Sequence, residues 1–401
     1  MLPAIILSSH TAGLGVIRAL GIKGVPIVSV YYDKNDMGYV SKYVKERVLA
    51  AHPEQHEEHF IGQLMDYAKK KGKGLVIPAD DATLSVVSKH KSVLEKYHIV
   101  ACPDWNITER IIDKKHTYAL AERIGIPLPR TIVPKSLDEL EQYGKSIDYP
   151  CLVKPCESHR YYEVFKRKMV RVENIVDLVS AYIQATDQGL EVMLQEYIPG
   201  EDDRGVNYNS YWCDGEPLVE FTAEKVRLSP QGFGVPSVVI SKEIPEVLEA
   251  GRMILKAMGY SGFSCTEFKK DTRDGVYKFM EVNGRHNRSA SLAMKCGINY
   301  PWIEYQHLVD GKTPAVSTYS HGIYWIDEFR DAYRYVEQCR KGRFSLIHQI
   351  RPYLKSNVFA VFDLRDLKPF IKRCIDMMNT LVVGSNNKLI VKDNSAKVPK
   401  I

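Results

Sequence analysis

The sequence predicts an α/β domain at the N-terminus, followed by a larger α+β region. Strand-like and helix-like segments alternate over residues 1–110, which is typical of a parallel sheet. After Ile111, apolar strands follow one another and are joined by short turns such as CDGEP and TRDG, which predict antiparallel hairpins. At roughly 100–200 residues per domain, a chain of 401 residues is long enough for two or three domains.

The first domain is expected to cover residues 1–110. Its predicted elements are the strand Ala4–Leu7, the helix Gly15–Leu20, the strand Pro26–Tyr31, the helix His59–Lys70 and the strand Gly74–Pro78. Ligands of parallel sheets gather at the carboxyl ends of the strands. Four polar residues follow two such ends and are therefore candidates for substrate binding: Ser9, His10, Asp80 and Asp81.

The sequence HTAGLG, between the first strand and the first helix, resembles part of a dinucleotide-binding fingerprint. It lacks the full G-x-G-x-x-G pattern, and only Asp33 lies near the position of a ribose-binding acid. A tight structural turn explains the same residues. NAD binding is therefore an alternative that depends on this motif alone.

A second domain is expected over residues 111–315, because the pattern changes at Ile111. A helix over Asp113–Ile124 ends at a glycine and is followed by two prolines, the usual chemistry of a helix end. The strands expected after it are Cys151–Lys154, Met169–Val172, Val192–Tyr197, Val206–Trp212, Pro217–Thr222, Gly262–Lys269 and Tyr277–Val282. A helical, basic C-terminal segment, 316–380, and a polar tail, 381–401, complete the predicted organisation.

Composition excludes several classes of protein. Apolar residues make up 45% and charged residues 26%, which argues against disorder, collagen and coiled coils. No stretch reaches the roughly 18–20 apolar residues of a membrane-spanning helix, and the N-terminus lacks the basic start of a secretory signal. The eight cysteines have no C-x-x-C pair and no zinc-site spacing, so we expect reduced thiols and a cytoplasmic location.

Lys154 ends the apolar strand of YPCLVKP. Burying an ammonium group is costly unless an anion meets it. The side chain therefore either reaches solvent along the surface or binds a phosphate, and this residue alone does not distinguish the two.

Glu196 ends another apolar strand, which runs into the turn EYIPG. The free backbone amides and carbonyls of such a turn, beside an acidic side chain, suit the edge of an adenine ring and a ribose hydroxyl. An exposed acidic turn is the simpler structural explanation.

Glu267 and Glu281 are predicted to face each other across a hairpin, since GFSCTEF and YKFMEVNGR are joined by the turn DTRDG. Two close carboxylates repel each other unless a divalent cation lies between them. Oxygen ligands from two glutamates and Asn283 suit Mg²⁺, and Arg285 adds a planar cation for a phosphate. A surface hairpin with scattered charges is the alternative.

The order of these motifs resembles the ATP-grasp superfamily of ligases over nearly the whole chain. The series consists of Asp113-Lys114, GIPLP, VKP, EYIPG, a strand with a glutamate, and E-x-N-x-R. The sequence is also similar to the predicted ATP-dependent carboligases of that superfamily, the group that includes D-aspartate ligase-like enzymes, in GLGVIRALG, KVRLSPQGFGVPS, KGRFSL and VFAVFDLRD. The resemblance implies an ATP-grasp fold preceded by a Rossmann-like domain.

The resemblance also implies a role for each matching residue. The implied ligands of ATP are Lys114 and Lys154 at the phosphates, Glu196 with the backbone of Tyr197 and Ile198 at adenine, and Asp202 or Asp203 at the ribose. The implied ligands of Mg²⁺ or Mn²⁺ are Glu267, Glu281 and Asn283. Arg285 would steady the transferred phosphate or a substrate carboxylate. Lys225 and Arg227, on a strand expected to face the same cleft, are further catalytic candidates.

The sequence departs from the family in two places. Residues 155–168, PCESHRYYEVFKRK, contain no glycine, whereas many ATP-grasp enzymes cover the triphosphate with a glycine-rich loop at this point. Side chains are expected to contribute instead, and the candidates are Ser158, His159, Arg160 and Lys168. Gly284 stands where the family usually has proline, which leaves the flanking Glu, Asn and Arg in place.

The function expected from the resemblance is ATP-dependent carboxylate–amine ligation. Phosphoryl transfer from ATP would turn an unreactive carboxylate into an acyl phosphate, which an amine attacks, and no side-chain nucleophile is needed. The expected substrates are an amino acid or a small peptide-like acid and amine. The alternatives are a catalytically silent ATP-binding module that regulates a partner, and an NAD-dependent dehydrogenase suggested by HTAGLG.

The formal charge of +6 is concentrated near the C-terminus. Residues 330–373 contain eleven Lys or Arg against four Asp or Glu, a surplus larger than that of the whole chain. The aromatic residues interleaved with them are Phe329, Tyr333, Phe344, Tyr353 and Phe370. A solvated basic face over an aromatic core explains this pattern, and a docking surface for an anionic substrate or a membrane is the alternative. No nucleic-acid partner is expected, and the sequence leaves the oligomeric state open.

Overall fold

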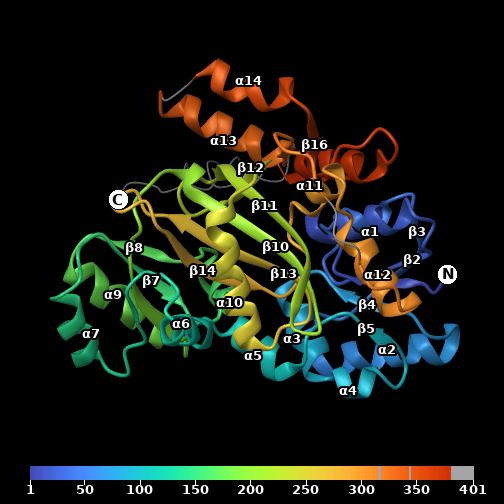
Figure 1. Ribbon diagram of the computed structural model, residues 1–401, viewed down its shortest axis with the longest axis horizontal. Coiled ribbons are helices and arrows are strands. Elements are labelled where there is room, and N and C mark those ends of the chain that lie inside the picture. Colours follow the sequence, from blue (N-terminus) through green and yellow to red (C-terminus); the bar gives the residue numbers. More distant parts are fainter. Residues whose placement is uncertain (315–317, 343–344, 381–401) are drawn as a thin grey trace, which may run out of the picture.

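Three β-sheets organise the chain (Figure 1). The structure is a computed structural model that describes residues 1–314, 318–342 and 345–380, so the predicted tail, 381–401, lies outside the described residues. The N-terminal sheet is parallel, and the other two are built mostly from antiparallel strands. This arrangement confirms the predicted α/β and α+β fold class.

The N-terminal sheet has five parallel strands in the order β3-β2-β1-β4-β5. They are β1 (Ala4–Leu7), β2 (Ile27–Tyr31), β3 (Val44–Leu49), β4 (Leu75–Pro78) and β5 (Ile99–Val100), with helices α1 (Thr11–Gly21), α2 (Glu57–Lys71), α3 (Asp81–Lys89) and α4 (Lys91–Leu94). Strand β3 is absent from the predicted elements because half of its sequence, VKERVL, is charged, as suits an edge strand. The strand order reverses between β1 and β4, so the residues after these two strands meet at one edge.

A four-stranded antiparallel sheet forms the smaller part of the second region, in the order β6-β9-β7-β8. Its elements are β6 (Thr131–Ile132), α7 (Leu137–Gly144), β7 (Cys151–Pro155), α8 (Ser158–Phe165), β8 (Val170–Val172), α9 (Ile175–Thr186) and β9 (Val192–Glu196). Leu140 of α7 and Leu178 of α9 share a core with Val153 and Leu194 of the sheet. The glycine-free segment after β7 forms helix α8, where many ATP-grasp enzymes are expected to have a glycine-rich loop.

A seven-stranded sheet forms the larger part, in the order β14-β13-β10-β11-β12-β15-β16. Its strands are β10 (Gly205–Cys213), β11 (Glu216–Ser229), β12 (Val235–Ser241), β13 (Gly262–Lys270), β14 (Tyr277–Asn283), β15 (Tyr324–Ile326) and β16 (Asn357–Phe359). The nearby helices are α5 (Trp105–Ile112), α6 (Lys114–Arg123), α10 (Leu248–Met258), α11 (Ala290–Lys295) and α12 (Tyr300–Asp310). Tyr208 packs with Ile254 of α10 in one core, and Tyr211 packs with Trp325 and Leu14 of α1 in another. The sheet thus has a buried layer on each face.

The C-terminal segment completes the large sheet, because β15 pairs with β12 and β16 pairs with β15. The boundary predicted at residue 316 therefore does not separate an independent unit. Helices α13 (Glu328–Arg340) and α14 (Leu346–Leu354) and a helix over 368–380 make up the rest of the segment. Phe329 and Phe370 lie 5.3 Å apart between ring centroids, and Tyr353 packs against Phe359, whereas Tyr333 is exposed. Phe344 lies outside the described residues.

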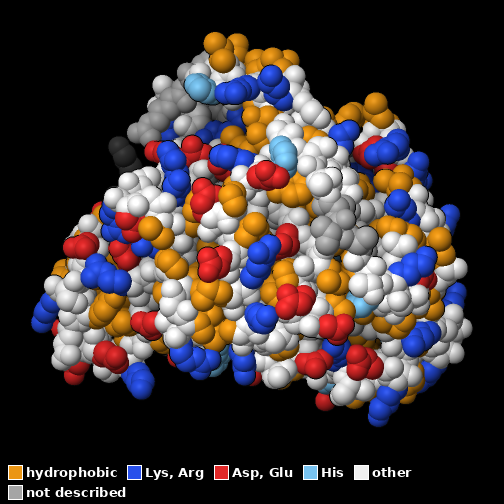
Figure 2. All heavy atoms as spheres, viewed as in Figure 1, with side chains coloured by type: hydrophobic (Ala, Val, Ile, Leu, Met, Phe, Trp, Pro, Cys, Tyr) orange, Lys and Arg blue, Asp and Glu red, His pale blue; other side chains and the backbone are white. Residues whose placement is uncertain are grey.

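The surface of the C-terminal segment is both apolar and basic. On the face shown in Figure 2, apolar and basic side chains gather at the top, over α13 and α14. Leu346, Ile347 and Leu354 of α14 are among the exposed apolar side chains. Among the helices in the described part of the chain, none combines the length and the apolar character needed to cross a bilayer. Contact of this surface with an anionic membrane stays a prediction.

A buried ion pair joins the C-terminal segment to helix α1. Arg18 Nε lies 3.0 Å from Asp366 Oδ2, and Arg18 Nη2 donates to the carbonyls of Val361 and Asp366. Asp366 also accepts hydrogen bonds from the Ser41 hydroxyl and the Lys42 amide. Because Arg18 and Asp366 are only 5% and 2% exposed, this network fixes the C-terminal segment against the N-terminal domain.

Asp36 is a buried carboxyl group whose ionisation is expected to cost stability. Burial raises the pKa of Asp36 to about 7, although its hydrogen bond from the Ser9 amide acts in the opposite direction. Because this pKa lies above that of an unfolded aspartate, stability should fall as the pH rises from about 4 to 7 and then stay constant. Asp36→Asn should therefore raise the free energy of unfolding by about 1–3 kcal/mol more at pH 8 than at pH 5, measured by urea unfolding. An equal effect at both pH values would contradict this assignment.

Candidate functional site

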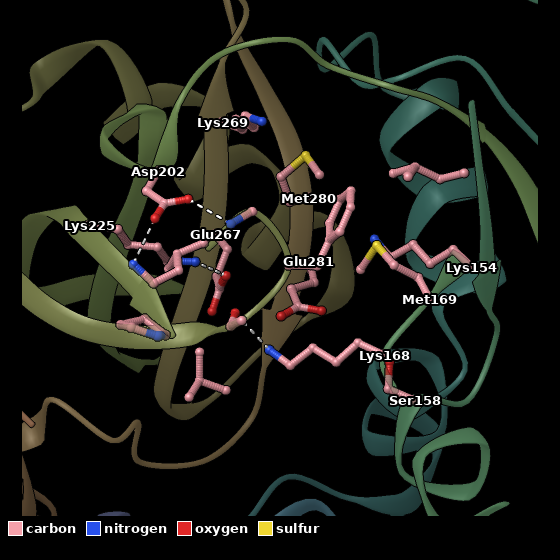
Figure 3. A pocket seen from close by; sticks show the side chains of 18 of the residues that line it. Lys154, Ser158, Lys168, Met169, Asp202, Lys225, Glu267, Lys269, Met280 and Glu281 are labelled. Carbon is pink, nitrogen blue, oxygen red and sulfur yellow. Dashed lines mark hydrogen bonds and ion pairs between the residues drawn. The ribbon is translucent and has the colours of Figure 1, made fainter. Parts of the chain in front are cut away.

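One cleft of about 870 Å³ collects most of the predicted site residues (Figure 3). Those that line it are Asp81, Lys114, Lys154, Lys168, Glu196, Tyr197, Ile198, Asp202, Lys225, Glu267, Glu281, Asn283 and Arg285. They come from both antiparallel sheets, from helices α3 and α6, and from the segments beside them. Nine Lys or Arg residues line the cleft against six Asp or Glu residues, so its formal charge suits a polyanion.

The two predicted metal-binding glutamates lie directly opposite each other. Glu267 of β13 and Glu281 of β14 are register partners in the antiparallel ladder, so their side chains leave the same face of the sheet. Asn283 lies two residues after Glu281 and therefore on the same face of β14. Two carboxylates and an amide oxygen are the donor set that Mg²⁺ prefers, so these residues fit the predicted metal.

Lysines from three separate segments surround this carboxylate pair. Lys114 contacts Glu281 and donates to the Ser158 hydroxyl at 2.9 Å. Lys225 contacts Glu267 (Figure 3). Burial alone would raise the pKa of Glu281, but the charges of Lys114 and Lys154 hold it far below its ordinary value. Burial alone would lower the pKa of Lys225, and the contact with Glu267 more than offsets this and raises it. Glu281 is therefore ionised and Lys225 protonated at neutral pH.

Lys154 is buried to 4% exposure, so of the two explanations that the sequence leaves open, surface exposure is wrong. Its ammonium group donates to the Tyr118 hydroxyl at 2.9 Å, and that hydroxyl donates to the carbonyl of Met280. Burial lowers the pKa of Lys154, while the charges of Glu281 and Glu267 oppose this change. The cleft thus holds a buried cation beside its carboxylate pair, which fits the predicted contact with an anion.

Lys168 crosses the cleft from the end of the glycine-free segment. Its ammonium group donates to the carbonyl of Gly234 at 3.2 Å, on the opposite wall (Figure 3). His159 of α8 lines the cleft, but its imidazole lies 2.8 Å from Glu54 of the N-terminal domain. Arg160 pairs with Glu157 and is not among the lining residues. Of the four side-chain candidates in this segment, Ser158 and Lys168 therefore face the cleft with their polar groups.

The affinity for nucleotide is expected to depend on the pH through Lys168. The cleft walls partly desolvate the ammonium group of Lys168, and this lowers its pKa to about 8. The charge of Glu281 acts in the opposite direction. The ammonium group is therefore present at pH 7 and lost as the pH rises past about 8. The Kd for ATP should rise about tenfold between pH 7 and pH 9.5 in calorimetric titrations. Lys168→Arg should remove this dependence because arginine keeps its charge.

Lys166→Arg is the matched control, since Lys166 belongs to the same segment and is exposed. This control should keep the pH dependence of the unmodified protein. A Kd for ATP that is the same at both pH values in the unmodified protein would contradict the role given to Lys168.

The hinge is the turn EYIPG at the end of β9. It offers backbone and side-chain amide groups rather than a free carboxylate. Glu196 accepts from the Arg130 amide and from Arg273, so its carboxylate is already engaged. The neighbouring Gln195 faces the cleft, and its Oε1 atom is buried without a hydrogen-bond partner among the described residues. The carbonyl of Ile198 accepts from Lys269 at 2.8 Å. An N–H donor such as an adenine amino group would satisfy Gln195.

Sequence reasoning missed Gln195 and Lys269, and only the alternation of side chains along a strand could have indicated Gln195. Apolar groups complete this end of the cleft. Met169 and Met280 lie on opposite sides of it in Figure 3, as the flat faces of a purine ring would require.

Only one of the two predicted ribose ligands lines the cleft. Asp202 lines it and accepts from the amides of Leu228 and Gly232, so it also holds the loop that follows β11 (Figure 3). Asp203 has a half-exposed side chain that pairs with Arg204, and it does not line the cleft. The structure thus favours Asp202 over Asp203.

Arg285 and Asp81 link the end of strand β14 to the N-terminal domain. The guanidinium group of Arg285 binds both carboxylate oxygens of Asp81, at 2.7 and 3.0 Å. This bidentate pair places the carboxyl edge of the parallel sheet beside Asn283, to which Arg285 also donates. Burial would raise the pKa of Asp81, but the charge of Arg285 lowers it. A small substrate bound at this edge would lie next to the carboxylate pair.

The other three residues predicted at this edge do not line the cleft. Ser9 is fully buried, its hydroxyl bonds to that of Ser29, and its side chain therefore cannot bind a substrate. His10 caps helix α1 by accepting from the amide of Ala12, and burial lowers its pKa to about 4. Asp80 caps α3 and accepts from Tyr32. Their roles in the structure are local, and the prediction for Ser9 is wrong.

Arg227 does not face the cleft, contrary to the prediction. Lys225 and Arg227 are two residues apart and would share a face on a regular strand. The pairing of β11 with β12 shifts register between them, so a β-bulge turns the second side chain away. The guanidinium group of Arg227 instead lies 3.1 Å from Asp331 and bonds to Gln349.

Close packing in the structure explains Gly13, the first glycine of HTAGLG. A Cβ atom at Gly13 would lie 2.2 Å from the carbonyl oxygen of Ser8, so α1 packs too closely on the preceding turn for any side chain there. None of the residues of this turn lines the cleft. The motif therefore gives no support to NAD binding.

Comparison with known proteins supports the resemblance found in the sequence. No protein-family model matches the chain. The chain is 27% identical over 271 residues to the D-aspartate ligase of Enterococcus faecium, and the match covers 63% of each protein. The chain therefore spans less than two thirds of that relative.

Solved structures share the fold at low sequence identity. The L-amino acid ligase from Bacillus licheniformis has a TM-score of 0.62 at 17% identity, covering 77% of this chain and 74% of that one. The biotin carboxylase domain of the Hydrogenobacter thermophilus 2-oxoglutarate carboxylase, in complex with MgADP, ADP and bicarbonate, has a TM-score of 0.64 at 18% identity, covering 81% of this chain and 73% of that one. The sequence relatives and the shared fold both support the resemblance to ATP-grasp ligases.

Proposed function

We propose that the protein is an ATP-dependent ligase that joins a carboxylate to an amine through an acyl phosphate. The observation that carries this proposal is the pairing of Glu267 with Glu281 in one cleft, with Lys114, Lys154 and Lys225 around them. Two carboxylates for a divalent cation and several cations for phosphates form the pattern that phosphoryl transfer needs. The similarity to a D-aspartate ligase and to an L-amino acid ligase supports an amino acid or a small peptide-like compound as substrate.

The cleft offers a distinct group of residues for each part of ATP. Gln195, the hinge at Ile198 and the two methionines suit adenine, and Asp202 lies next along the wall for the ribose. Lys154 and Lys168 are the cations for the phosphate oxygens. Glu267, Glu281 and Asn283 would hold Mg²⁺, or Mn²⁺, which when bound supplies charge neutralisation at the phosphates.

The reaction then needs placement and charge rather than a protein nucleophile. A substrate carboxylate oxygen attacks the γ-phosphorus of ATP, the bond to ADP breaks, and the acyl phosphate forms. The amine next attacks the acyl carbon, inorganic phosphate leaves with the C–O bond electrons, and the nitrogen loses a proton. Lys154 and Lys168 neutralise the charge on the transferred group, and Arg285 orients the acid at the edge formed with Asp81. Helix α8, together with the contact that Lys168 makes after it with the carbonyl of Gly234, would limit the access of water.

A substrate screen with two readouts tests this proposal. Pairs of acids and amines drawn from the amino acids are added with ATP and Mg²⁺, and ADP release is measured by a coupled assay. Hydroxylamine added in place of the amine should trap the acyl phosphate as a hydroxamate. Hydroxamate formation that depends on the acid would support the proposal. Release of ADP without any hydroxamate or amide would contradict it.

A catalytically silent nucleotide-binding module is the second candidate. The observation in its favour is that helix α8 replaces the glycine-rich loop and that Lys114 and Lys225 already pair with the two glutamates. ATP binding at micromolar Kd, with neither ADP nor hydroxamate formed from any acid, would favour this candidate.

The proposal implies a cytoplasmic location, where ATP is available and thiols stay reduced. All eight cysteines are free in the structure, in agreement with this setting.

A further inference from the structure

Two arginines share a single carboxylate beside the cleft, and a third arginine lies near one of them. Arg288 Nη2 donates to Asp327 Oδ2 at 2.8 Å and to the Thr11 hydroxyl at 2.9 Å. Arg330 Nε lies 3.6 Å from the same Asp327 oxygen. Arg373 has no hydrogen bond or ion pair to any described residue, yet it lies close enough for its charge to lower the pKa of Arg330. One carboxylate thus pairs with two guanidinium groups, and the charge of a third acts on one of them.

This cluster is not satisfied by its own contacts. The Nε atom of Arg288 is buried without a partner among the described residues. Arg330 has a side chain that is 40% exposed, and it lines the cleft. Burial of the guanidinium group lowers the pKa of Arg330, and the charge of Arg288 lowers it further. The charge of Asp327 acts in the opposite direction and raises it. Guanidinium groups held together in this way gain stability when an anion binds between them.

Helix α1 adds positive potential to the same place. The helix begins at Thr11, whose hydroxyl contacts Arg288, and its first turn contains no acidic residue. The positive end of its dipole is therefore directed at the cluster without a compensating carboxylate on the helix. Its capping residue, His10, stays neutral because burial lowers its pKa to about 4.

The cluster reaches the cleft through Arg330, because Arg288 and Arg373 are not among the residues that line it. The charges that act most strongly on Arg330 are those of Arg288, Asp327 and Arg373. Those that act on Lys168 are instead Glu281, Glu267 and two other lysines. Because Arg330 lines the same cleft as Arg285, an extended substrate could contact both regions at once.

We infer that Arg288, Arg330 and Arg373 form a second anion subsite, which holds a carboxylate or phosphate group that the substrate carries away from its reacting atoms. The inference rests on the proposed function and narrows it to substrates with at least one anionic group besides the reacting carboxylate. It also gives a purpose to the basic C-terminal segment, which supplies Arg330 and Arg373.

Direct anion binding to the full-length protein tests the subsite. Inorganic phosphate and malonate are titrated separately by calorimetry, with and without saturating Mg-ADP, so that nucleotide occupies its own region. Three proteins are compared: the unmodified chain, the double variant Arg330→Gln/Arg373→Gln, and the double variant Arg340→Gln/Arg351→Gln. The last has the same net charge and changes two exposed arginines of the same segment.

The unmodified protein and the control should bind at least one anion at millimolar concentration in the presence of Mg-ADP. The Arg330→Gln/Arg373→Gln variant should bind that anion at least about tenfold more weakly. Its Kd for Mg-ADP should stay within about twofold of that of the control. Preference for phosphate would indicate a phosphorylated substrate, and preference for malonate would indicate a polycarboxylate.

Two results would overturn the inference: no anion binding to the unmodified protein, or equal binding by both double variants. An equally large loss of Mg-ADP affinity in the Arg330→Gln/Arg373→Gln variant would assign these arginines to the nucleotide region instead, and would also overturn it. Failure of the proposed function has a different signature, because the screen of acids and amines would then give no acid-dependent hydroxamate, while these titrations still report on the arginines.

Discussion

Replacing Glu281 with Gln should lower the rate of ADP formation by at least about a thousandfold, provided that an active acid and amine pair has been found. The substitution keeps the shape of the side chain but removes one of the two charges available to a divalent cation between β13 and β14. It also leaves the ammonium group of Lys114 without its carboxylate partner. Initial rates of ADP release at saturating ATP and Mg²⁺ measure the effect.

Glu224→Gln is the control for this experiment. Glu224 lies on β11 of the same sheet and pairs with Lys242, so the control also removes one member of a lysine–glutamate pair. It does not line the cleft, and its ADP formation should stay within about twofold of the unmodified rate. Both variants should unfold at denaturant midpoints near that of the unmodified protein. A Glu281→Gln enzyme that retains more than a tenth of the activity would remove Glu281 from the metal site.

The motif order was sufficient to predict the centre of the cleft. Lys154, Glu267 and Glu281 each belong to a strand with a clear apolar pattern, so the direction of the side chain follows from strand geometry. The hairpin turn DTRDG even predicts that the two glutamates face each other, as their register confirms. Local periodicity and turn chemistry carry this information, and both can be observed in a single sequence.

Residues whose position depends on distant pairing could not be predicted in the same way. The alternation of side chains along a regular strand would place Arg227 on the same face as Lys225. A β-bulge in the pairing of β11 with β12 turns its side chain away from the cleft, and a single sequence does not show that pairing. Ser9 follows a strand end, as a ligand-binding residue would, yet it is buried against Ser29 on the neighbouring strand. Gln195 is the reverse case. It stands next to Glu196 and the sequence pattern does not single it out, so only the structure shows that its buried side-chain oxygen has no partner among the described residues.

The C-terminal segment shows the same limit on a larger scale. The composition shows its surplus of Lys and Arg. The composition does not show which of these side chains lie on the surface. Arg330 and Arg288 share Asp327, and the charge of Arg373 acts on Arg330, because β15 joins the large sheet and because Asp366 fixes the chain beyond β16 to helix α1. These contacts join residues far apart in the sequence, by 348 positions for Arg18 and Asp366, and no local pattern indicates them.

Asp366→Ala should destabilise the protein by about 3–5 kcal/mol, the largest loss of stability expected from any single change discussed above. The substitution leaves Arg18 of helix α1 buried without its counter-charge, and it removes the acceptor of the Ser41 hydroxyl and the Lys42 amide. Urea unfolding followed by circular dichroism gives the free energy. Asp363→Ala is the control, because Asp363 pairs with the largely exposed Arg365 and should cost less than about 1 kcal/mol.

The double variant Arg18→Met/Asp366→Ala distinguishes a buried unpaired charge from a simple loss of packing. If the cost of Asp366→Ala comes from the uncompensated guanidinium group, removing that group as well should restore part of the stability, since a buried ion pair is often replaced by apolar side chains at little cost. Two additive losses would show instead that the hydrogen bonds to Val361 and Ser41 matter more than the charge pair. Either outcome bears on Arg330 and Arg373, because the Arg18–Asp366 pair fixes the segment that carries them to the domain that supplies Thr11.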